Sequence, residues 1–309
     1  MTSFPYELVH DDPTSAAKTQ QHEDKFAELA AFMNAEPDEI AFGQTTTFLL
    51  RSLGQALKSL LNSDCEIVVS NLCHEGSAAA WVALAKDLNI AIKWWAPPPG
   101  YDPVLSLETL RPLLTPKTRL VTCNHVSNVI GTIHPIRQVA DLVHSIPGTF
   151  LVVDGVAWAP HRPIDVKALD VFGPHIAQLY GWRSAQNRVL TGISHYFLGG
   201  IPSLDWRLRL GTNSFELEEA LVPITRYLKQ VGWDNVIAQE TVLQDVFLAH
   251  LRRRPQVFRI FGEKSSDAQK RMPVITFEVI GHSPTVVTNK FNQRGRFLEA
   301  EEIENELRT

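Results

Sequence analysis

Several polar residues stand just after buried, β-branched segments, where their side chains could bind a ligand. Asp154 ends the run FLVVD, and Ser127 and Asn128 follow the run RLVTC within HVSNVIGTIHPI. If both runs are strands of a parallel sheet, these side chains emerge at its carboxyl edge, where open α/β sheets bind ligands. A buried carboxylate there needs a cation, which the protonated nitrogen of a heteroaromatic ring can supply. The alternative is that Asp154 only caps the turn before Gly155.

A second group of residues could bind phosphate at the start of a helix. The segment GQTTT, residues 43–47, precedes an apolar helical run, so its backbone N–H groups and hydroxyls would face an anion at the positive end of the helix dipole. Gly211 and Thr212 stand at a similar position before FELEEAL. A threonine-rich N-cap is also common in helices that bind no ligand, so this pattern is a weak signal on its own.

His74 follows the strand-like run EIVVS and opens a helical segment, at the same predicted edge of the sheet. An imidazole there could stack on a flat heteroaromatic ring, although a single histidine at a helix start is more often a polar cap. The three cysteines, Cys65, Cys73 and Cys123, have neither a disulfide pattern nor zinc-ligand spacing. We expect them to be reduced bystanders, and we predict no metal site.

The elements that would position these residues alternate along the first half of the chain. The expected strands are 66–70, 90–95, 119–123 and 150–154, and the expected helices before and between them are 22–34, 48–60, 76–88, 105–114 and 135–144. This alternation predicts an α/β fold, a right-handed βαβ array with a mostly parallel sheet flanked by helices.

The second half of the chain is less regular. A proline-punctuated stretch leads to the strand candidate GPHIAQLYG, followed by expected helices at 215–230, 236–253 and 284–295 and expected strands at 257–261 and 274–280. We therefore expect three parts: an N-terminal arm at 1–24, a large α/β domain at 25–213 and a smaller, truncated α+β domain at 214–309. The charged last residues have a weak helical pattern.

The composition favours a small-molecule ligand. The chain has 309 residues, 44% of them hydrophobic, and a net charge of −5, so we expect no basic face for nucleic acid or anionic lipid. No run approaches the roughly 18 apolar residues of a membrane helix, and the first residues do not form a signal-peptide pattern. These features predict a soluble, cytoplasmic protein.

The chain resembles the class V aminotransferases, in their cysteine desulfurase-like subgroup, through an ordered series of segments. They are FGQTTT, SNLCHEGSAAAW, LTPKTRLVTCNHVSNVIGTIHPI, FLVVDGVAWAPHRPIDVKAL, GPHIAQLYG and LGTNSFELEEAL. The resemblance runs from about residue 25 to Gly295, and its central part is highly specific. It implies a fold-type I homodimer that binds pyridoxal 5′-phosphate at the subunit interface and acts on an amino acid.

Carried over by position, the resemblance implies roles for individual residues. The cofactor phosphate would be bound by three hydroxyls, those of Thr46, Thr47 and, in the partner's site, Thr212. His74 would stack on the pyridine ring, and Asn128 would bond the ring hydroxyl. Asp154 would pair with the ring nitrogen and keep it protonated, which lets the ring accept electrons from a neighbouring carbanion.

The chain departs from the family's pattern in three ways. Family members have a strand that ends in the Schiff-base lysine, whereas here IDVKALD runs directly into VFGPHIAQLYG. Lys167 is the nearest lysine, but it aligns with a surface position, and we expect a solvated charge. Ala157 stands where a glutamine or histidine usually contacts the ring. The arginine that clamps the substrate carboxylate is not identifiable. Because the Schiff-base lysine is absent, we assign no catalytic residue.

Two hypotheses remain open. Without the lysine, covalent attachment of the cofactor and proton transfer at Cα are lost, so turnover should fall by orders of magnitude although cofactor binding could survive. The first hypothesis is a transferase or lyase that acts on an amino acid in specialised-metabolite biosynthesis, with the lysine supplied only in an intact form. The second is a catalytically impaired binding protein or dimer partner. A nicotinamide enzyme is disfavoured, because no G-x-G-x-x-G follows any strand. The sequence names neither the substrate nor the type of reaction.

Overall fold

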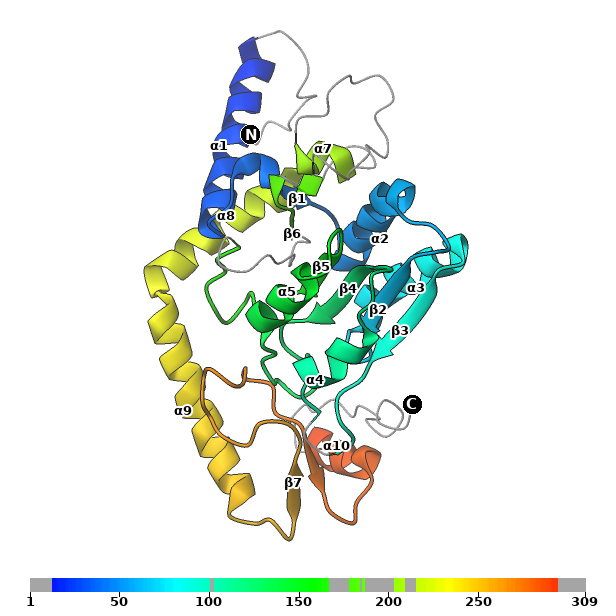
Figure 1. Ribbon diagram of the computed structural model, residues 1–309. Coiled ribbons are helices and arrows are strands. Elements are labelled where there is room, and N and C mark those ends of the chain that lie inside the picture. Colours follow the sequence, from blue (N-terminus) through cyan, green and yellow to red (C-terminus); the bar gives the residue numbers. More distant parts are fainter. Residues whose placement is uncertain are drawn as a thin grey trace.

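The centre of the structure is a four-stranded parallel sheet (Figure 1). The computed structural model of the chain describes residues 13–100, 103–166, 178–183, 185–186, 203–208 and 215–293. The strand order is β3-β2-β4-β5, and the bounds are β2 (Glu66–Ser70), β3 (Ala91–Trp95), β4 (Thr118–Asn124) and β5 (Phe150–Asp154). All three pairings are parallel, so the predicted parallel sheet is confirmed.

Helices cover both faces of this sheet because the inner strands have apolar side chains on both sides. In β2, Ile67 and Val69 pack with the helices of one face, whereas Val68 packs with those of the other. The first face is covered by α2 (Thr46–Leu57) and α3 (Glu75–Leu88), and the second by α4 (Leu107–Leu110) and α5 (Ile136–His144). Strands buried on both faces are typical of parallel sheets.

The helix expected at 105–114 is shorter than predicted. Four residues form α4, and the next turn is a 3-10 helix at Arg111–Leu113. Pro112 explains the change, because proline has no N–H to continue the α-helical hydrogen bonds. Other 3-10 turns lie at Pro37–Glu39 and Lys58–Leu60.

A second, two-stranded sheet joins β1 (Ile40–Phe42) to β6 (Gln178–Tyr180) in antiparallel pairing. The short helix α7 (Leu204–Leu208) holds this sheet, since the Asp205 carboxylate accepts a hydrogen bond from the Phe42 N–H at 3.0 Å. β6 lies within the expected strand GPHIAQLYG, whereas β1 and α7 were not predicted. Elements of three and five residues are too short to show a hydrophobic period.

The first helix begins earlier than expected and packs along a helix from the second half of the chain. α1 (Pro13–Phe32) lies beside α8 (Phe215–Val231), as Figure 1 shows. Arg226 pairs with Glu28 at 2.7 Å, and Lys25 pairs with Glu219. The boundary expected at residues 24 and 25 therefore falls inside α1, and the division of the chain into three parts stays a prediction.

The C-terminal part has a small core. α9 (Trp233–Arg252) packs on the antiparallel pair β7 (Phe258–Ile260) and β8 (Phe277–Val279), with Leu248, Leu251 and Ile260 buried between them, and α10 (Pro284–Asn292) follows. These elements match the expected ones to within a few residues.

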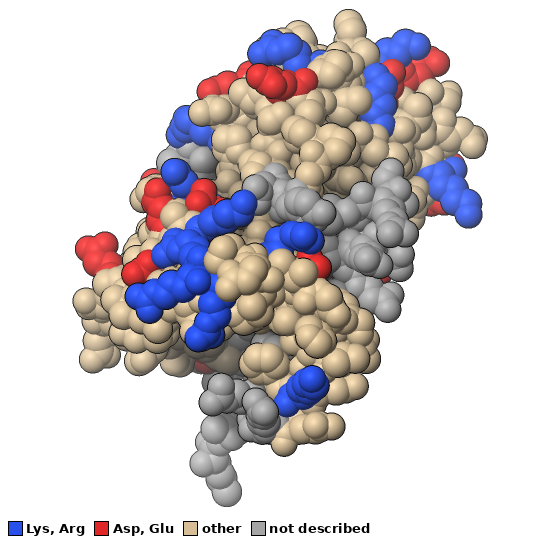
Figure 2. Space-filling view, turned by 90° about the horizontal axis from the view of Figure 1, so that it is seen from below, with Lys and Arg blue, Asp and Glu red and all other residues tan. Residues whose placement is uncertain are grey.

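The surface at this end of the molecule has charges of both signs. Viewed from below, lysines and arginines gather on one side with carboxylates beside them (Figure 2). Ion pairs in this part of the chain include Arg252 with Asp245 at 3.3 Å and Arg259 with Glu278 at 2.6 Å. None of the helices among the described residues has the length and hydrophobicity that crossing a bilayer requires.

Side chains buried on β4, an inner strand of the parallel sheet, should contribute more to the free energy of unfolding than exposed side chains do. Leu120 lies in this strand and is fully buried, so Leu120→Ala leaves a cavity and should lower the free energy of unfolding by about 2–5 kcal/mol. Leu243 on α9 is 60% exposed, so Leu243→Ala should change the free energy of unfolding by less than about 0.5 kcal/mol. Chemical denaturation of both variants measures the contrast, and equal losses would contradict this description of the core.

Candidate functional site

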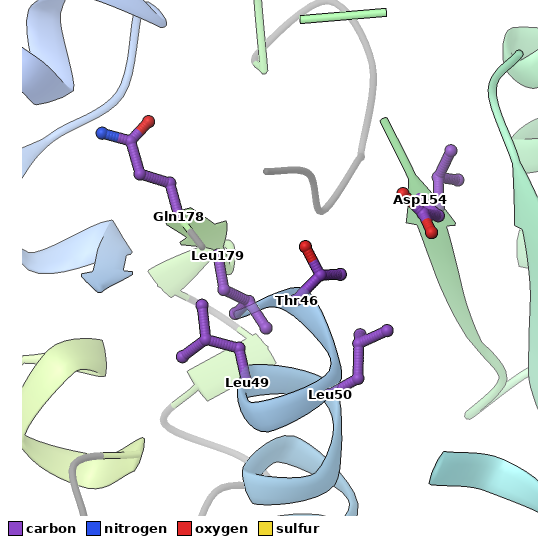
Figure 3. Close-up of a pocket in the computed structure, with 7 residues that line it drawn as sticks. Thr46, Leu49, Leu50, Asp154, Gln178 and Leu179 are labelled. Carbon is purple, nitrogen blue, oxygen red and sulfur yellow. The ribbon is translucent and has the colours of Figure 1, made fainter. Parts of the chain in front are cut away.

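A small pocket lies at the carboxyl end of β5, between that strand, β6 and the start of α2 (Figure 3). Its apolar lining comes from Leu49, Leu50, Val153 and Leu179, and its polar lining from Thr46, Asp154 and Gln178. A pocket with apolar walls and a few polar groups suits a small, partly aromatic ligand. The structure thus brings two of the predicted site residues, Thr46 and Asp154, to one pocket.

The start of α2 provides hydrogen-bond donors beside this pocket. Thr45 is the N-cap residue, and its hydroxyl accepts a hydrogen bond from the Phe48 N–H at 3.1 Å. Thr46 and Thr47 are the first two helical residues, so their N–H groups have no acceptor within the helix. This end of a helix attracts anions. The arrangement is compatible with the predicted phosphate site, which stays a prediction.

The start of α3 lies directly against the start of α2. A Cβ atom on Gly76 would come within 2.5 Å of the Thr47 hydroxyl oxygen and 3.2 Å of His74 Nδ1, so a larger residue here would displace the Thr47 side chain. His74 is the N-cap residue of α3, and its Nδ1 accepts a hydrogen bond from the Gly76 N–H at 3.1 Å. The polar-cap alternative is therefore observed, whereas ring stacking by the exposed imidazole stays a prediction.

Asp154 ends β5 and is half-buried. One carboxylate oxygen accepts a hydrogen bond from the Val156 N–H at 3.0 Å, which is the turn-capping contact weighed above. Burial, reinforced by the Asp154 charge, raises the pKa of the Cys73 thiol to about 12. Burial also raises the pKa of Cys123, with smaller effects from Cys73 and Asp154. Both thiols therefore stay protonated at neutral pH.

The loop after β4 presents Asn128 to solvent. Ser127 is buried, and its hydroxyl accepts hydrogen bonds from the N–H groups of Val129 and Ile130 at 3.3 and 3.2 Å. Asn128 is exposed and is not among the seven residues that line the pocket. Its contact with a ring hydroxyl stays a prediction. Thr212 and Lys167 lie outside the residues that the structure describes.

Sequence reasoning missed an aromatic pair beside Asp154. His125, directly after β4, stacks on Trp158 with ring centroids 4.0 Å apart and planes 8° from parallel. The His125 N–H also donates to the Asp154 carbonyl oxygen at 2.8 Å. His125 follows β4 and Trp158 follows β5, so both rings lie at the carboxyl edge of the sheet. Their positions just after predicted strands could have marked them as site candidates in the sequence. Gln178 was also missed, because it lies on a three-residue strand.

Two buried imidazoles in this region are uncharged at neutral pH. Burial, together with the charge of His134, lowers the pKa of His125 to about 3. Burial lowers the pKa of His134 to about 4. The backbones of the two residues are joined by a hydrogen bond from the His134 N–H to the His125 carbonyl oxygen at 2.8 Å. Neither imidazole therefore adds positive charge near the end of β4 at neutral pH.

Comparison with known proteins identifies relatives over almost the whole chain. The model of the family described as aminotransferase class-V matches residues 6–300. The cysteine desulfurase-like protein ustD of Aspergillus flavus is 52% identical over 312 residues, which cover 96% of this chain and 71% of that protein. The nonribosomal peptide synthetase-like enzyme fsqF of Aspergillus fumigatus is 83% identical over 307 residues. This chain spans 21% of the length of fsqF.

A solved structure supports the same fold. The apo cysteine desulfurase from Thermococcus onnurineus NA1 superposes with a TM-score of 0.76 at 20% identity, over 96% of this chain and 79% of that one. At this identity the likeness shows the fold alone. The fold-type I architecture predicted from the sequence is therefore confirmed.

The buried histidines predict acid sensitivity. An unfolded histidine has a pKa near 6.5, whereas His134 in the folded chain has a pKa of about 4. Between these values the unfolded chain binds more protons, so the free energy of unfolding should fall as the pH drops below about 6.5. The loss from His134 alone should be on the order of 2 kcal/mol at about pH 5.

Denaturation of the parent and His134→Asn at several pH values measures this effect. The variant should lose less stability between neutral and acidic pH than the parent loses. The exposed His282 provides a matched control, and His282→Asn should follow the parent profile. Parallel profiles for the parent and His134→Asn would contradict the buried, neutral state of His134.

Proposed function

From the premise that the chain belongs to the class V aminotransferase family, we propose that it binds pyridoxal 5′-phosphate and acts on an amino acid as a transferase or lyase. The observation that carries the proposal is the shared pocket of Asp154 and Thr46. A carboxylate and the start of a helix face one space, as a ligand with a cationic ring nitrogen and an anionic tail requires.

The residues of the pocket fit this cofactor. Leucine and valine side chains line the pocket, so a flat ring could pack against them. Asp154 stands at the end of β5, where its negative charge would hold a proton on the ring nitrogen. The N–H groups of Thr46 and Thr47 at the start of α2 would bind the phosphate.

Residues beside the pocket complete the proposed site. His74 and Thr47 meet across Gly76, so the imidazole would lie near the phosphate-binding helix and stack on the ring. Asn128 would bond the ring hydroxyl from the loop after β4. When bound, pyridoxal phosphate supplies an electron-accepting ring that stabilises negative charge at the amino acid's Cα. The chain's own contribution is to bind and orient the ring and to fix the proton on its nitrogen.

The relatives suggest the biological setting. One is described as cysteine desulfurase-like, and another as a nonribosomal peptide synthetase-like enzyme. We therefore place the chain's activity in specialised-metabolite biosynthesis, with a small amino acid-type substrate. A homodimer in which Thr212 reaches the partner's phosphate site, working in the cytoplasm, completes the proposal.

The Asp154 pairing can be tested by cofactor binding. Asp154→Ala removes a charge-assisted hydrogen bond worth about 1.5–3 kcal/mol, so affinity for pyridoxal 5′-phosphate should fall roughly 10- to 100-fold. Equilibrium dialysis of the parent and the variant measures this loss. Asp141→Ala, on the exposed face of α5, is the control and should bind like the parent. Unchanged affinity in Asp154→Ala would exclude the proposed ring pairing.

A non-catalytic cofactor-binding protein or dimer partner is the second candidate. It is favoured by one observation: none of the seven described residues that line the pocket is a lysine. Without a pocket lysine the cofactor is held by charge, hydrogen bonds and packing alone, and borohydride has no lysine–cofactor linkage to reduce.

Borohydride reduction of the loaded chain separates the two candidates. If the second candidate is correct, all of the cofactor should dialyse away after reduction and denaturation. Intact mass spectrometry reads the result directly. A reduced cofactor attached to a lysine would instead support an ordinary catalyst of the family and reject the second candidate.

A further inference from the structure

The loop that presents Asn128 is held by a segment from the distant C-terminal part of the chain. We call residues 127–133 the Asn128 loop and residues 262–276 the clamp segment. The Met272 N–H donates to the Gly131 carbonyl oxygen at 2.8 Å, and the Ile133 N–H donates to the Lys270 carbonyl oxygen at 3.0 Å. The two segments thus meet as neighbouring strands do, although about 140 residues separate them.

Glycines make this approach possible from both sides. Gly131 has a φ of 70°, and a Cβ atom there would collide with the Val274 carbonyl oxygen of the clamp segment. Gly262 has a φ of 71°, and its Cβ would come within 2.7 Å of the Thr132 hydroxyl oxygen in the Asn128 loop. Each segment therefore places a glycine against the other's backbone or side chain, in a conformation that other residues rarely adopt.

A buried arginine holds the clamp segment in shape. Arg271 is fully buried, and its guanidinium donates to the carbonyl oxygens of Glu263, Met272 and Val274. Burial lowers its pKa, with the Glu263 charge opposing that effect. Because a buried guanidinium is costly unless its donors are paired, these carbonyl contacts fix the curvature of the clamp segment.

The Thr276 side chain of the clamp segment contacts the backbone beside Asn128. Its hydroxyl donates to the carbonyl oxygen of Val129, the residue that follows Asn128. On the other side, Ser127 is 3% exposed and donates its N–H to the Thr132 carbonyl oxygen at 3.0 Å. Both neighbours of Asn128 are therefore fixed, and only the Asn128 side chain is left exposed at the edge of the sheet.

We propose that Thr276, supported by Arg271, is a positioning residue for the cofactor: it holds the Asn128 loop so that the Asn128 amide meets the ring hydroxyl. The inference rests on the proposed function. It assigns a binding role to the C-terminal part of the chain, which contributes none of the described residues that line the pocket. The clamp segment acts through Asn128 and does not touch the cofactor.

The test compares Thr276→Val with Thr276→Ser. Valine has nearly the same shape but no hydroxyl, whereas serine keeps the hydroxyl and loses a methyl group. Loss of one hydrogen bond should weaken pyridoxal 5′-phosphate binding roughly fivefold in Thr276→Val, and Thr276→Ser should stay within about twofold of the parent. Equilibrium dialysis gives the affinities. Thr276→Val is preferred to a substitution of Arg271, since losing the buried arginine would endanger folding.

A double-mutant cycle with Asn128→Ala separates positioning from general structural damage. If Thr276 acts through Asn128, adding Thr276→Val to Asn128→Ala should cause no further loss of affinity for pyridoxal 5′-phosphate. The pH at which the bound cofactor's ring hydroxyl loses its proton, read from its absorbance, should shift alike in both single variants. Arg259→Met perturbs the pairing of β7 with β8, away from the Asn128 loop, and should leave affinity and that pH unchanged.

The outcomes are distinguishable. A parent chain that binds no pyridoxal 5′-phosphate would overturn the proposed function, and the inference with it. A parent that binds, with Thr276→Val equal to it or with additive losses in the double variant, would overturn the inference alone.

Discussion

A carboxylate at the end of a buried strand requires positive charge or hydrogen-bond donors near it, and this requirement organises the site. The Val156 N–H supplies one such donor to the Asp154 carboxylate. The buried imidazoles of His125 and His134 are neutral at neutral pH, because burial lowers their pKa values. A ligand with a cationic ring nitrogen suits such a place, because its charge is matched in an apolar setting where electrostatic attraction is strong.

The parallel sheet determines where this can happen. In a βαβ array the strands end at one edge and the helices that follow them begin there, as α3 does after β2. The end of β5 also lies beside the start of α2, which precedes the parallel sheet in the chain. The start of α2 favours a bound anion, whereas the Asp154 carboxylate at the end of β5 favours a bound cation. These opposite preferences face one small pocket. A dipolar ligand, anionic at one end and cationic at the other, is the chemical complement of that arrangement.

Local sequence patterns predicted the sheet because its strands are short, β-branched and buried, and the expected strands match β2 to β5 to within a residue. Helix ends were less predictable: Pro112 shortens α4, and α1 begins well before the expected residue 22. Thr46 and Asp154 were foreseen because each adjoins an element whose end could be located. The His125–Trp158 stack and the Thr276–Val129 hydrogen bond join residues 33 and 147 positions apart, and no periodicity encodes such contacts.

The state of the ring nitrogen tests the central claim most directly. Nitrogen-15 NMR of the chain loaded with ring-labelled pyridoxal 5′-phosphate should give the chemical shift of a protonated pyridine at neutral pH. That proton should persist to a higher pH than in the free cofactor, because the Asp154 charge stabilises it. An unprotonated nitrogen in the bound state, or loss of its proton at the same pH as in the free cofactor, would contradict the account.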